Sequence, residues 1–353
     1  MRVLGVNAVF HDPAAALVAD GRIAAAAEEE RFSRRKHGKS AVPFATWELP
    51  EQAMRFCLGR AGLQPADLDA VAYSYDPGLA PDDADITADA WEPLRTLFAR
   101  RAPNFLATAL PGLDPAKVVF VPHHVAHAAS AYLAAGWEDC AVLVCDGRGE
   151  RASMLAGAVR GGELTVLSTQ ALPHSLGFLY SRLTEHLGFH RDSDEYKVMA
   201  MASYGKPSFI EELRELVAAD GQGGFRVDPA LDLERWAPRL TGGDDWTPAH
   251  ADLASSVQTR LEEVLLDLLG WLHAQTGAAR LAMAGGVALN CVANTRLLQE
   301  GPFDELFVQP AAGDAGTALG AALWVAREHG DRIEPMRTAD LGRAWGDDEL
   351  LAW

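Results

Sequence analysis

The chain has 353 residues, of which 49% are hydrophobic and 23% are charged, and its formal net charge is −18 at pH 7. This length allows one large or two medium-sized domains with a substantial core. The negative charge disfavours nucleic acid as the main partner, because affinity for a phosphate backbone depends on clustered lysine and arginine. The four cysteines show no C-x-x-C spacing, and no apolar run reaches the roughly 18 residues of a membrane span, so we expect a cytoplasmic protein without a membrane partner.

The chain begins with three predicted strands. Residues 2–8 and 14–19 are apolar and of strand length, and a turn that contains His11 and Asp12 separates them. An Asp-Gly pair at residues 20–21 is a strong two-residue hairpin signal, and the third strand follows it. Farther on, residues 77–115 form an acidic insertion that we expect to be helical.

A predicted helix and the strand after it carry the first candidate site. Residues 122–136 are rich in alanine, and on this helix His123 and His127 stand four residues apart, so both imidazoles project from one face. The strand over residues 141–145 ends at Asp146, which opens an Asp-Gly-x-Gly turn. Nitrogen and oxygen donors without thiolate suit Fe, Mn, Zn or Ni. The alternative is a helix with one buried and one capping histidine.

The order of elements in the first thirty residues occurs a second time. Residues 141–169 again predict a strand, a glycine-rich turn, a strand, a hairpin and a strand. Two such copies, each followed by helices, describe an α/β fold, the duplicated actin-like ATPase (ribonuclease H-like) fold of actin, sugar kinases and Hsp70. In that fold two lobes surround a central nucleotide and metal cleft. Two unrelated three-strand meanders are the alternative.

The second half of the chain contains candidate nucleotide ligands. Lys197 lies among apolar residues, so we expect it to point at an anion or a carboxylate, with an exposed ammonium group as the alternative. A buried strand over residues 281–284 leads into Gly285 and Gly286, then Asn290, and a helix is predicted from about Asn294. Paired glycines allow a ligand to approach the backbone, and the start of a helix favours phosphate.

A fourth metal ligand follows from the last predicted strand. Residues 305–309 lead to Gly313 and Asp314, again on a glycine-flanked turn. The repeat would bring Asp314 towards Asp146, and it completes a set of two imidazoles and two carboxylates.

Together these stretches resemble the O-carbamoyltransferases of antibiotic and nodulation-factor biosynthesis (the NodU/CmcH/TobZ-like family). More distantly they are similar to the tRNA threonylcarbamoyl-transfer proteins of the Kae1 group. Seven motifs carry the resemblance, in family order from residue 2 to residue 322: GVNAVFHDPAAALVADG, EEERFSRRKH, HHVAHAASAY, VCDGRGE, DEYKVMAMASYGKP, AGGVALNCVAN and GDAGTALGAAL. One departure is Ala200, where the family usually has glycine, and it removes no chemical group.

The resemblance implies a set of functional residues. It assigns the metal, Fe(II) with Mn or Zn as alternatives, to His123, His127, Asp146 and Asp314. It assigns catalytic roles to His11, Asp12 and Lys36, with His37 beside Lys36. It assigns the nucleotide, as ATP or carbamoyl-adenylate and with Mg as a further ion, to Gly147, Gly149, Lys197, Gly285, Gly286, Asn290 and Gly313.

The resemblance also implies a domain organisation. Residues 1–353 would form one Kae1-like domain, with lobe I over about 1–120, lobe II over about 121–330 and the start of a linker over 331–353. Similar enzymes carry a C-terminal YrdC-like domain that makes carbamoyl-adenylate from ATP and carbamoyl phosphate, and its signature does not occur in this sequence. We therefore expect an isolated N-terminal domain that needs a YrdC-like domain in cis or in trans, with a homodimer as an oligomeric form to test.

The expected function is carbamoyl transfer from carbamoyl-adenylate to a hydroxyl group of a small-molecule natural product. An alcohol needs a base, and His11 oriented by Asp12 is the candidate; the alternative is a turn histidine that only bonds the backbone. Three other functions stay open: a tRNA threonylcarbamoyl-transfer subunit, a non-catalytic nucleotide-binding scaffold and a sugar kinase. Residues 77–115 and 208–250 are expected to shape the acceptor pocket, but nothing in them selects an acceptor.

Overall fold

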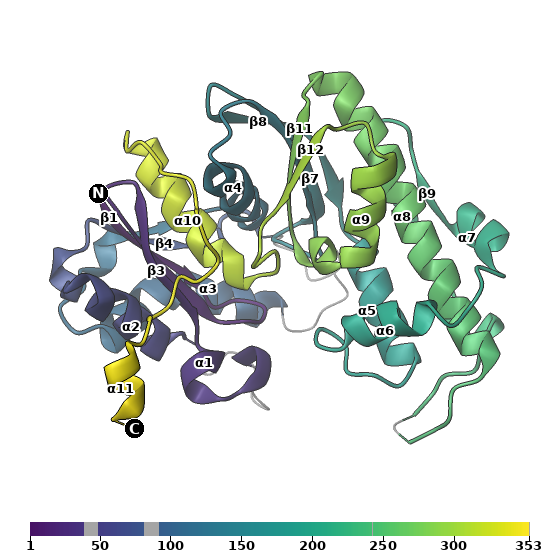
Figure 1. Ribbon diagram of the computed structural model, residues 1–353, viewed down its shortest axis with the longest axis horizontal. Coiled ribbons are helices and arrows are strands. Elements are labelled where there is room, and N and C mark those ends of the chain that lie inside the picture. The colour runs from purple at the N-terminus through teal and green to yellow at the C-terminus, as the bar shows by residue number, and fades with distance from the viewer. Residues whose placement is uncertain (39–48, 81–91, 242, 353) are drawn as a thin grey trace. The chain divides into compact units, whose positions relative to one another are not determined.

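The computed structural model describes residues 1–38, 49–80, 92–241 and 243–352. The chain divides into two compact units (Figure 1). Unit 1 consists of Met1–Pro77, Pro93–Gly136 and Asp314–Trp353, and unit 2 consists of Gly78–Glu92 and Trp137–Gly313. Residues 81–91 of the predicted insertion lie outside the described residues, and we describe each unit by itself.

Unit 1 contains a five-stranded sheet with the order β3-β2-β1-β4-β5. β1 pairs antiparallel with β2 and parallel with β4, and β4 pairs parallel with β5. The central strands are almost entirely buried, as their continuous apolar sequences predict. The strands are β1 (Arg2–Asn7), β2 (Ala14–Ala19), β3 (Arg22–Glu28), β4 (Ala70–Tyr73) and β5 (Val118–Phe120).

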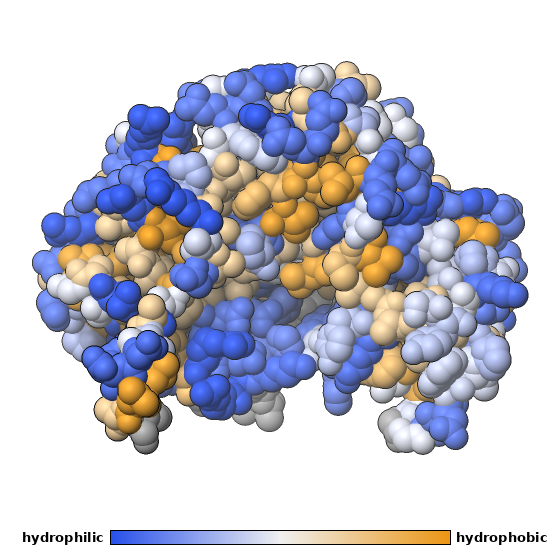
Figure 2. Space-filling model, viewed as in Figure 1, coloured by the Kyte–Doolittle hydropathy of each residue, from blue (hydrophilic) through white to orange (hydrophobic). Residues whose placement is uncertain are grey.

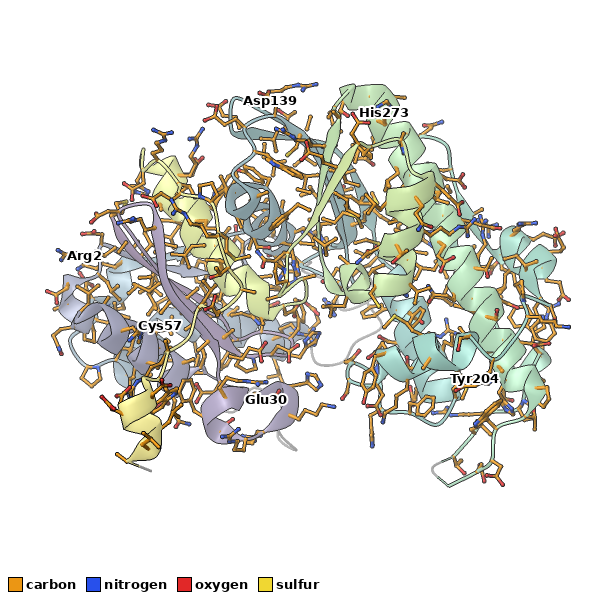
Figure 3. All side chains as sticks on the ribbon, viewed as in Figure 1. Arg2, Glu30, Cys57, Asp139, Tyr204 and His273 are labelled. Carbon is orange, nitrogen blue, oxygen red and sulfur yellow. The ribbon has the colours of Figure 1, made fainter. Side chains whose placement is uncertain are left out.

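Two helices cover the sheet of unit 1. α2 packs on β2 and β3, where the buried Cys57 thiol lies 3.5 Å from the Ala15 carbonyl oxygen (Figure 3). α10 packs on β1, β2 and β4 and also on α4. The helices in the sequence of this unit are α1 (Glu30–Ser33), α2 (Glu51–Ala61), α3 (Glu92–Ala109), α4 (His123–Ala135), α10 (Ala315–Glu328) and α11 (Asp347–Leu351).

Glycine permits the close contacts of α10. A Cβ atom on Gly5 would lie 1.8 Å from the carbonyl oxygen of Ala318, and a Cβ atom on Gly320 would lie 1.8 Å from that of Ala126. Neither distance is compatible with a side chain, since both neighbours are backbone atoms. α10 therefore lies against β1 on one side and α4 on the other at distances that only glycine allows.

Unit 2 contains a sheet with the same plan. Its order is β12-β11-β6-β7-β8, in which β6 pairs antiparallel with β7 and parallel with β11. Position by position, β6, β7, β8, β11 and β12 correspond to β1, β2, β3, β4 and β5. This correspondence confirms the duplicated fold that the repeat predicts. The bounds are β6 (Cys140–Cys145), β7 (Ala152–Arg160), β8 (Glu163–Ala171), β11 (Arg280–Ala284) and β12 (Glu305–Val308), with a separate hairpin of β9 (Val217–Ala219) and β10 (Phe225–Val227).

The long helix α8 forms the core of unit 2. It contacts α5, α6, α7, α9 and both β6 and β7. Its predicted apolar stripe is buried, which confirms that the stripe belongs to the core. The helices are α5 (Leu176–His186), α6 (Glu195–Ala202), α7 (Ile210–Leu216), α8 (Pro248–Thr276) and α9 (Cys291–Glu300). Among the described residues no helix is both long enough and apolar enough to cross a membrane.

The two predicted lobes differ from the observed units. Residues 121–136 and 314–330, expected in the second lobe, belong to unit 1, where α4 packs on α10, and residues 78–92, expected in the first lobe, belong to unit 2. Part of the predicted linker is bound to unit 1: Glu334 N donates to Gly21 O, Met336 N to Ala134 O and Ala26 N to Leu341 O. Beyond these contacts α11 exposes Leu350 and Leu351, and Figure 2 shows apolar surface at the place where Figure 1 draws α11.

Replacement of Gly320 by alanine is expected to destabilise unit 1. The new methyl group must displace the backbone of α4, and overpacking of this kind costs roughly 1–3 kcal/mol or more. The matched control is Gly59→Ala in α2, where nothing lies within 4 Å of the new Cβ and helix propensity favours alanine by up to about 1 kcal/mol. Urea unfolding of both variants checks the prediction, and equal stability of Gly320→Ala and the wild type would contradict it.

Candidate metal and catalytic centre

Three buried side chains of unit 1 converge at the starts of two helices. His123 and His127 lie on the first turns of α4, and Asp314 is the residue before α10. The Nε2 atoms of His123 and His127 each lie 3.4 Å from Asp314 Oδ1. Both imidazoles are fully buried and the carboxylate is 2% exposed. The close packing of α10 on α4 brings residues 123, 127 and 314 together.

The contacts around His123 fix its ring. Its Nδ1 lies 3.1 Å from the carbonyl oxygen of Ser74, which can only accept a hydrogen bond, so Nδ1 carries the proton and Nε2 faces Asp314. The Phe10 ring packs edge-on against the imidazole, with centroids 5.2 Å apart. Thr317, on the first turn of α10, donates a 2.8 Å hydrogen bond to the Ser74 hydroxyl. The ring is therefore oriented before any ligand arrives.

Asp314 remains ionised inside this cluster. Burial raises the pKa of its carboxyl group, but the neighbouring imidazoles of His11, His123 and His127 lower it more, and the net pKa lies well below the ordinary value. Its Oδ2 atom is buried and accepts no hydrogen bond from any residue that the structure describes. An ionised carboxylate with a free buried oxygen needs a cation, since burial of such a group is otherwise costly.

The three residues fit a transition metal. Their ligand atoms, two imidazole nitrogens and one carboxylate oxygen, lie within 4.8 Å of one another. This donor set suits Fe, Mn or Zn better than Ca or Mg, which prefer oxygen ligands. Asp146, the fourth expected ligand, belongs to unit 2, and its part in the site stays a prediction.

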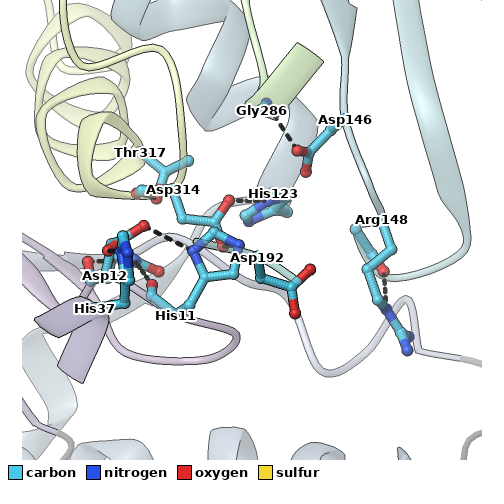
Figure 4. Close-up of polar contacts among 12 residues, drawn as sticks. His11, Asp12, His37, His123, Asp146, Arg148, Asp192, Gly286, Asp314 and Thr317 are labelled. Carbon is cyan, nitrogen blue, oxygen red and sulfur yellow. Dashed lines mark hydrogen bonds and ion pairs between the residues drawn. The ribbon is translucent and has the colours of Figure 1, made fainter. Parts of the chain in front are cut away.

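A second cluster of unit 1 lies in the turn after β1. His11 Nδ1 lies 2.8 Å from Asp12 Oδ2, and His11 Nε2 lies 3.8 Å from Asp314 Oδ2 (Figure 4). The other carboxylate oxygen, Asp12 Oδ1, lies 2.8 Å from His37 Nδ1. Asn7 fixes the turn, because its side-chain amide donates to the carbonyl oxygens of His11 and Asp12.

The two imidazoles keep Asp12 ionised. Burial raises the pKa of Asp12, but the hydrogen bonds from His11 and His37 lower it more, and the net pKa lies below its ordinary value of 3.8. Lys36, predicted as the catalytic partner, has an exposed side chain without a hydrogen bond or ion pair among the described residues. The structure thus brings His37, the next residue, to Asp12 in the turn after β1.

The glycine turns of unit 2 form around Asp146. Its Oδ1 accepts a 2.8 Å hydrogen bond from Gly286 N (Figure 4). Gly285 has φ of 95°, and a Cβ there would lie 2.3 Å from Cys145 O. Ser175 donates a 2.7 Å bond to Gly147 O, which closes the turn from the side of α5. The strand ends of β6 and β11 thus meet with their backbones in close contact.

The other predicted nucleotide residues are placed as follows. Gly149 N donates a hydrogen bond to Ala152 O within the turn after β6. Gly313 follows Ala312 in the chain, and the carbonyl oxygen of Ala312 accepts a hydrogen bond from Gly285 N. Asn290 is buried, caps α9 through a bond from Ala293 N and bonds Gln258. This cap explains why α9 begins three residues earlier than the sequence predicts.

Lys197 is less buried than its sequence context suggests. Its side chain is 41% exposed, and the ammonium group lies 2.9 Å from Asp194 Oδ2. The hydrogen bond that Lys197 donates to Asp194 raises the pKa of Lys197. The expected carboxylate partner of Lys197 is thus Asp194, and the side chain is also partly exposed, as in the alternative.

Several residues of these clusters carry no separate signal in the sequence. Phe10, Ser74 and Thr317 orient His123, yet each belongs to a common residue type in an ordinary apolar or small-residue context. In unit 2 the buried Arg148 donates a 2.6 Å hydrogen bond to Glu92. An Arg within the Asp-Gly-x-Gly turn was a detectable signal, but its partner 56 residues away was not.

Replacement of Asp12 by asparagine is expected to destabilise the protein in a pH-dependent manner. The folded pKa lies below the unfolded value, so the ionised carboxylate stabilises the fold above the unfolded pKa and this contribution is lost as pH falls through the folded pKa. The difference in unfolding free energy between wild type and Asp12→Asn should reach about 1–3 kcal/mol near neutral pH and shrink below about pH 4. Urea unfolding at several pH values measures it; a difference that is constant or grows towards acid pH contradicts the assignment.

Comparison with known proteins identifies relatives along almost the whole chain. An uncharacterized protein of Synechocystis sp. is 36% identical over 99% of this chain and 62% of its own length. Nodulation protein NolNO of Sinorhizobium fredii is 36% identical over 98% of this chain and 52% of its own length. The chain therefore spans roughly half to two thirds of the length of these relatives.

A solved structure and a family profile complete the comparison. The crystal structure of HypF from T. kodakarensis aligns with 93% of this chain and 47% of its own length, with a TM-score of 0.54 and 15% identity, which supports the actin-like ATPase fold alone. The profile described as Carbamoyltransferase N-terminus matches residues 2–82 and 103–323. The residues of both clusters of unit 1 fall within the matched ranges. The chain belongs to the carbamoyltransferase family, of which it carries the N-terminal region.

Proposed function

We propose that this chain transfers a carbamoyl group from carbamoyl-adenylate to a hydroxyl group of a small-molecule natural product. The observation that carries the proposal is the position of His11: Asp12 binds its Nδ1, and its Nε2 lies 3.8 Å from the buried Asp314 of the metal-ligand cluster. A base beside a candidate metal site suits acyl transfer to an alcohol. Membership of the carbamoyltransferase family supports the choice of acyl group.

His11 is the proposed general base. In the proposed state Asp12 accepts a hydrogen bond from Nδ1–H of His11, and Nε2 is the basic nitrogen that takes the proton. Since an alcohol has a pKa far above neutral pH, removal of its proton as the new bond forms lowers the barrier. The acceptor oxygen bonds the carbamoyl carbon, the bond from that carbon to the phosphate oxygen breaks, AMP leaves and the hydroxyl proton goes to Nε2.

The metal site is proposed to assist at the acyl group. His123, His127 and Asp314 would hold the ion, with Asp146 as the fourth ligand, and Fe(II) is the proposed ion with Mn or Zn as alternatives. A metal bound there would supply Lewis acidity for the carbamoyl carbonyl or the phosphate. The chain's own contribution is the preset ring orientation of His123 through Ser74 and Phe10.

The turns of unit 2 are proposed to bind the nucleotide. The backbones of Gly147, Gly285 and Gly286 carry no side chain that would keep a phosphate at a distance, and the start of α9 favours an anion. Lys197, Gly149, Asn290 and Gly313 belong to the same proposal. Because the relatives are much longer, we also propose that a YrdC-like domain, in cis or in trans, supplies carbamoyl-adenylate.

Replacement of His11 by asparagine is expected to abolish transfer and to leave nucleotide binding intact. The side-chain amide retains a donor to Asp12 but lacks the basic Nε2, and loss of a general base costs about 10²–10⁴-fold in rate. The full chain receives carbamoyl-adenylate and a panel of polyhydroxylated acceptors, and acceptor-dependent AMP release is measured beside AMP binding by calorimetry. Transfer by His11→Asn at the wild-type rate would refute the role of His11.

Replacement of His127 by alanine is expected to remove the bound metal. His127 supplies one of the two imidazoles, and loss of one ligand from a three- or four-ligand site strongly weakens binding of the ion. The matched control is His124→Ala, which alters a buried histidine of the same helix outside the cluster. Elemental analysis of protein purified without chelator should find about one equivalent of transition metal in wild type and in His124→Ala, and almost none in His127→Ala. Equal metal content in all three would exclude the site.

A further inference from the structure

We infer that His37 is a positioning residue for the base His11 and that it acts through Asp12. This inference rests on the proposed function, which gives His11 its role. His37 comes from a different segment, the short helical turn at Lys36–Gly38, and reaches the catalytic turn 25 residues earlier in the chain. Only the pairing of His11 with Asp12 follows from their adjacency in sequence.

The geometry around Asp12 shows what His37 does. Each oxygen of the carboxylate has its own imidazole: Oδ2 lies 2.8 Å from His11 Nδ1 and Oδ1 lies 2.8 Å from His37 Nδ1. A carboxylate that binds one donor can still rotate about its Cβ–Cγ bond. A second donor on the other oxygen fixes the plane of the group, and thereby the direction from which Oδ2 accepts the hydrogen bond of His11 Nδ1–H.

His37 is itself held from two sides. Its backbone N donates a 3.0 Å hydrogen bond to Glu30 Oε2, and its carbonyl oxygen accepts a 3.0 Å hydrogen bond from Asp12 N. The segment of His37 is therefore joined to Asp12 twice, once through the side chains and once through the backbones. Two bonds between the same pair of residues make a rigid clamp between two loops.

The backbone conformations of Asp12 and His37 indicate that surrounding contacts hold both residues in place. Asp12 has φ of 50° and His37 has φ of 57°, both in the left-handed region that residues with a side chain seldom adopt. Such conformations persist only where the surrounding contacts determine them. Next to His37, a Cβ atom on Gly38 would lie 2.3 Å from Pro13 Cδ, so the two loops are in direct contact there as well.

The imidazoles of His11 and His37 contact different groups on either side of Asp12. His11 is the one with Nε2 3.8 Å from Asp314, so it faces the metal-ligand cluster. His37 contacts the other oxygen of Asp12, and its backbone N donates a hydrogen bond to Glu30. We therefore assign proton transfer to His11 and orientation to His37.

Two substitutions of His37 separate these roles. Asparagine places an amide N–H close to the position of Nδ1 and can still donate to Asp12 Oδ1, whereas leucine has similar bulk and no donor. With carbamoyl-adenylate and the acceptor that gives the highest wild-type rate, we expect His37→Leu to lower kcat about 10- to 100-fold with KM within about threefold, and His37→Asn to stay within about threefold of wild type in both. In the Asp12→Asn background, His37→Leu should lower kcat by less than about threefold further, because the effect of His37 passes through Asp12.

A second measurement, of the His11 tautomer, does not depend on carbamoyl transfer. In full chain labelled with ¹⁵N-histidine, NMR reports the tautomer of His11, whose signals are assigned from the His11→Asn variant. We expect the Nδ1–H tautomer in wild type and in His37→Asn, and a mixture of tautomers with faster exchange of that proton in His37→Leu. The control is His329→Leu, at the end of α10, which should change neither the kinetics nor the His11 signals.

The outcomes distinguish the inference from the proposed function. If wild type releases no AMP with any acceptor, the proposed function fails, and the His11 tautomer still decides whether His37 positions it. If His11→Asn abolishes transfer while His37→Leu leaves kcat and the His11 tautomer unchanged, the inference is overturned alone. A His37→Leu protein with His11 signals altered and circular dichroism unchanged supports it.

Discussion

The structure of unit 1 depends on one buried carboxylate. Asp314 is almost fully enclosed, ionised and faced by His123 and His127, each with Nε2 at 3.4 Å. An isolated ionised carboxylate in such a place would be strongly destabilising. The imidazoles compensate for part of that cost, and a bound cation would compensate for more. The rest of the centre, from the Ser74 carbonyl to the His11 turn, serves to hold these groups in place.

The fold supplies the positions through backbone contacts rather than through long side chains. Gly320 lets α10 lie directly against α4, and Gly5 lets β1 lie against α10. The starts of α4 and α10 are thus fixed relative to each other, and the residues at those starts are the candidate ligands. In unit 2 the same principle appears at Gly285, where the backbone after β11 meets Cys145 at the end of β6. The duplicated sheet therefore provides two sites of close backbone approach, one in each unit.

The sequence predicts those features that depend on local pattern. The two sheets follow from the repeated strand–turn–strand–hairpin–strand order, and the pairing of His123 with His127 follows from helical spacing. The partner of those histidines, Asp314, followed from the repeat and lies close to them in unit 1. The N-terminal pair of His11 and Asp12 is also local, and it is confirmed as a hydrogen-bonded pair.

Features that depend on tertiary contacts are not predictable in this way. His37 and Lys36 are adjacent, and only the left-handed turn at His37 decides which side chain reaches Asp12. Lys197 looks buried by its neighbours, but the face of a short helix determines its exposure. The bonds of Glu334, beyond the last long helix, to the first hairpin could not be foreseen, because no periodic pattern marks them.

We propose that imidazoles and a carboxylate of this chain ligate a metal next to His11. X-ray absorption at the iron edge, on full chain purified under reducing conditions and loaded with Fe(II), tests it most directly. We expect nitrogen and oxygen ligands at about 2.0–2.2 Å, with the outer-shell scattering of two imidazole rings and no sulfur. A spectrum with thiolate ligands, or one of oxygen ligands without imidazole scattering, would contradict it.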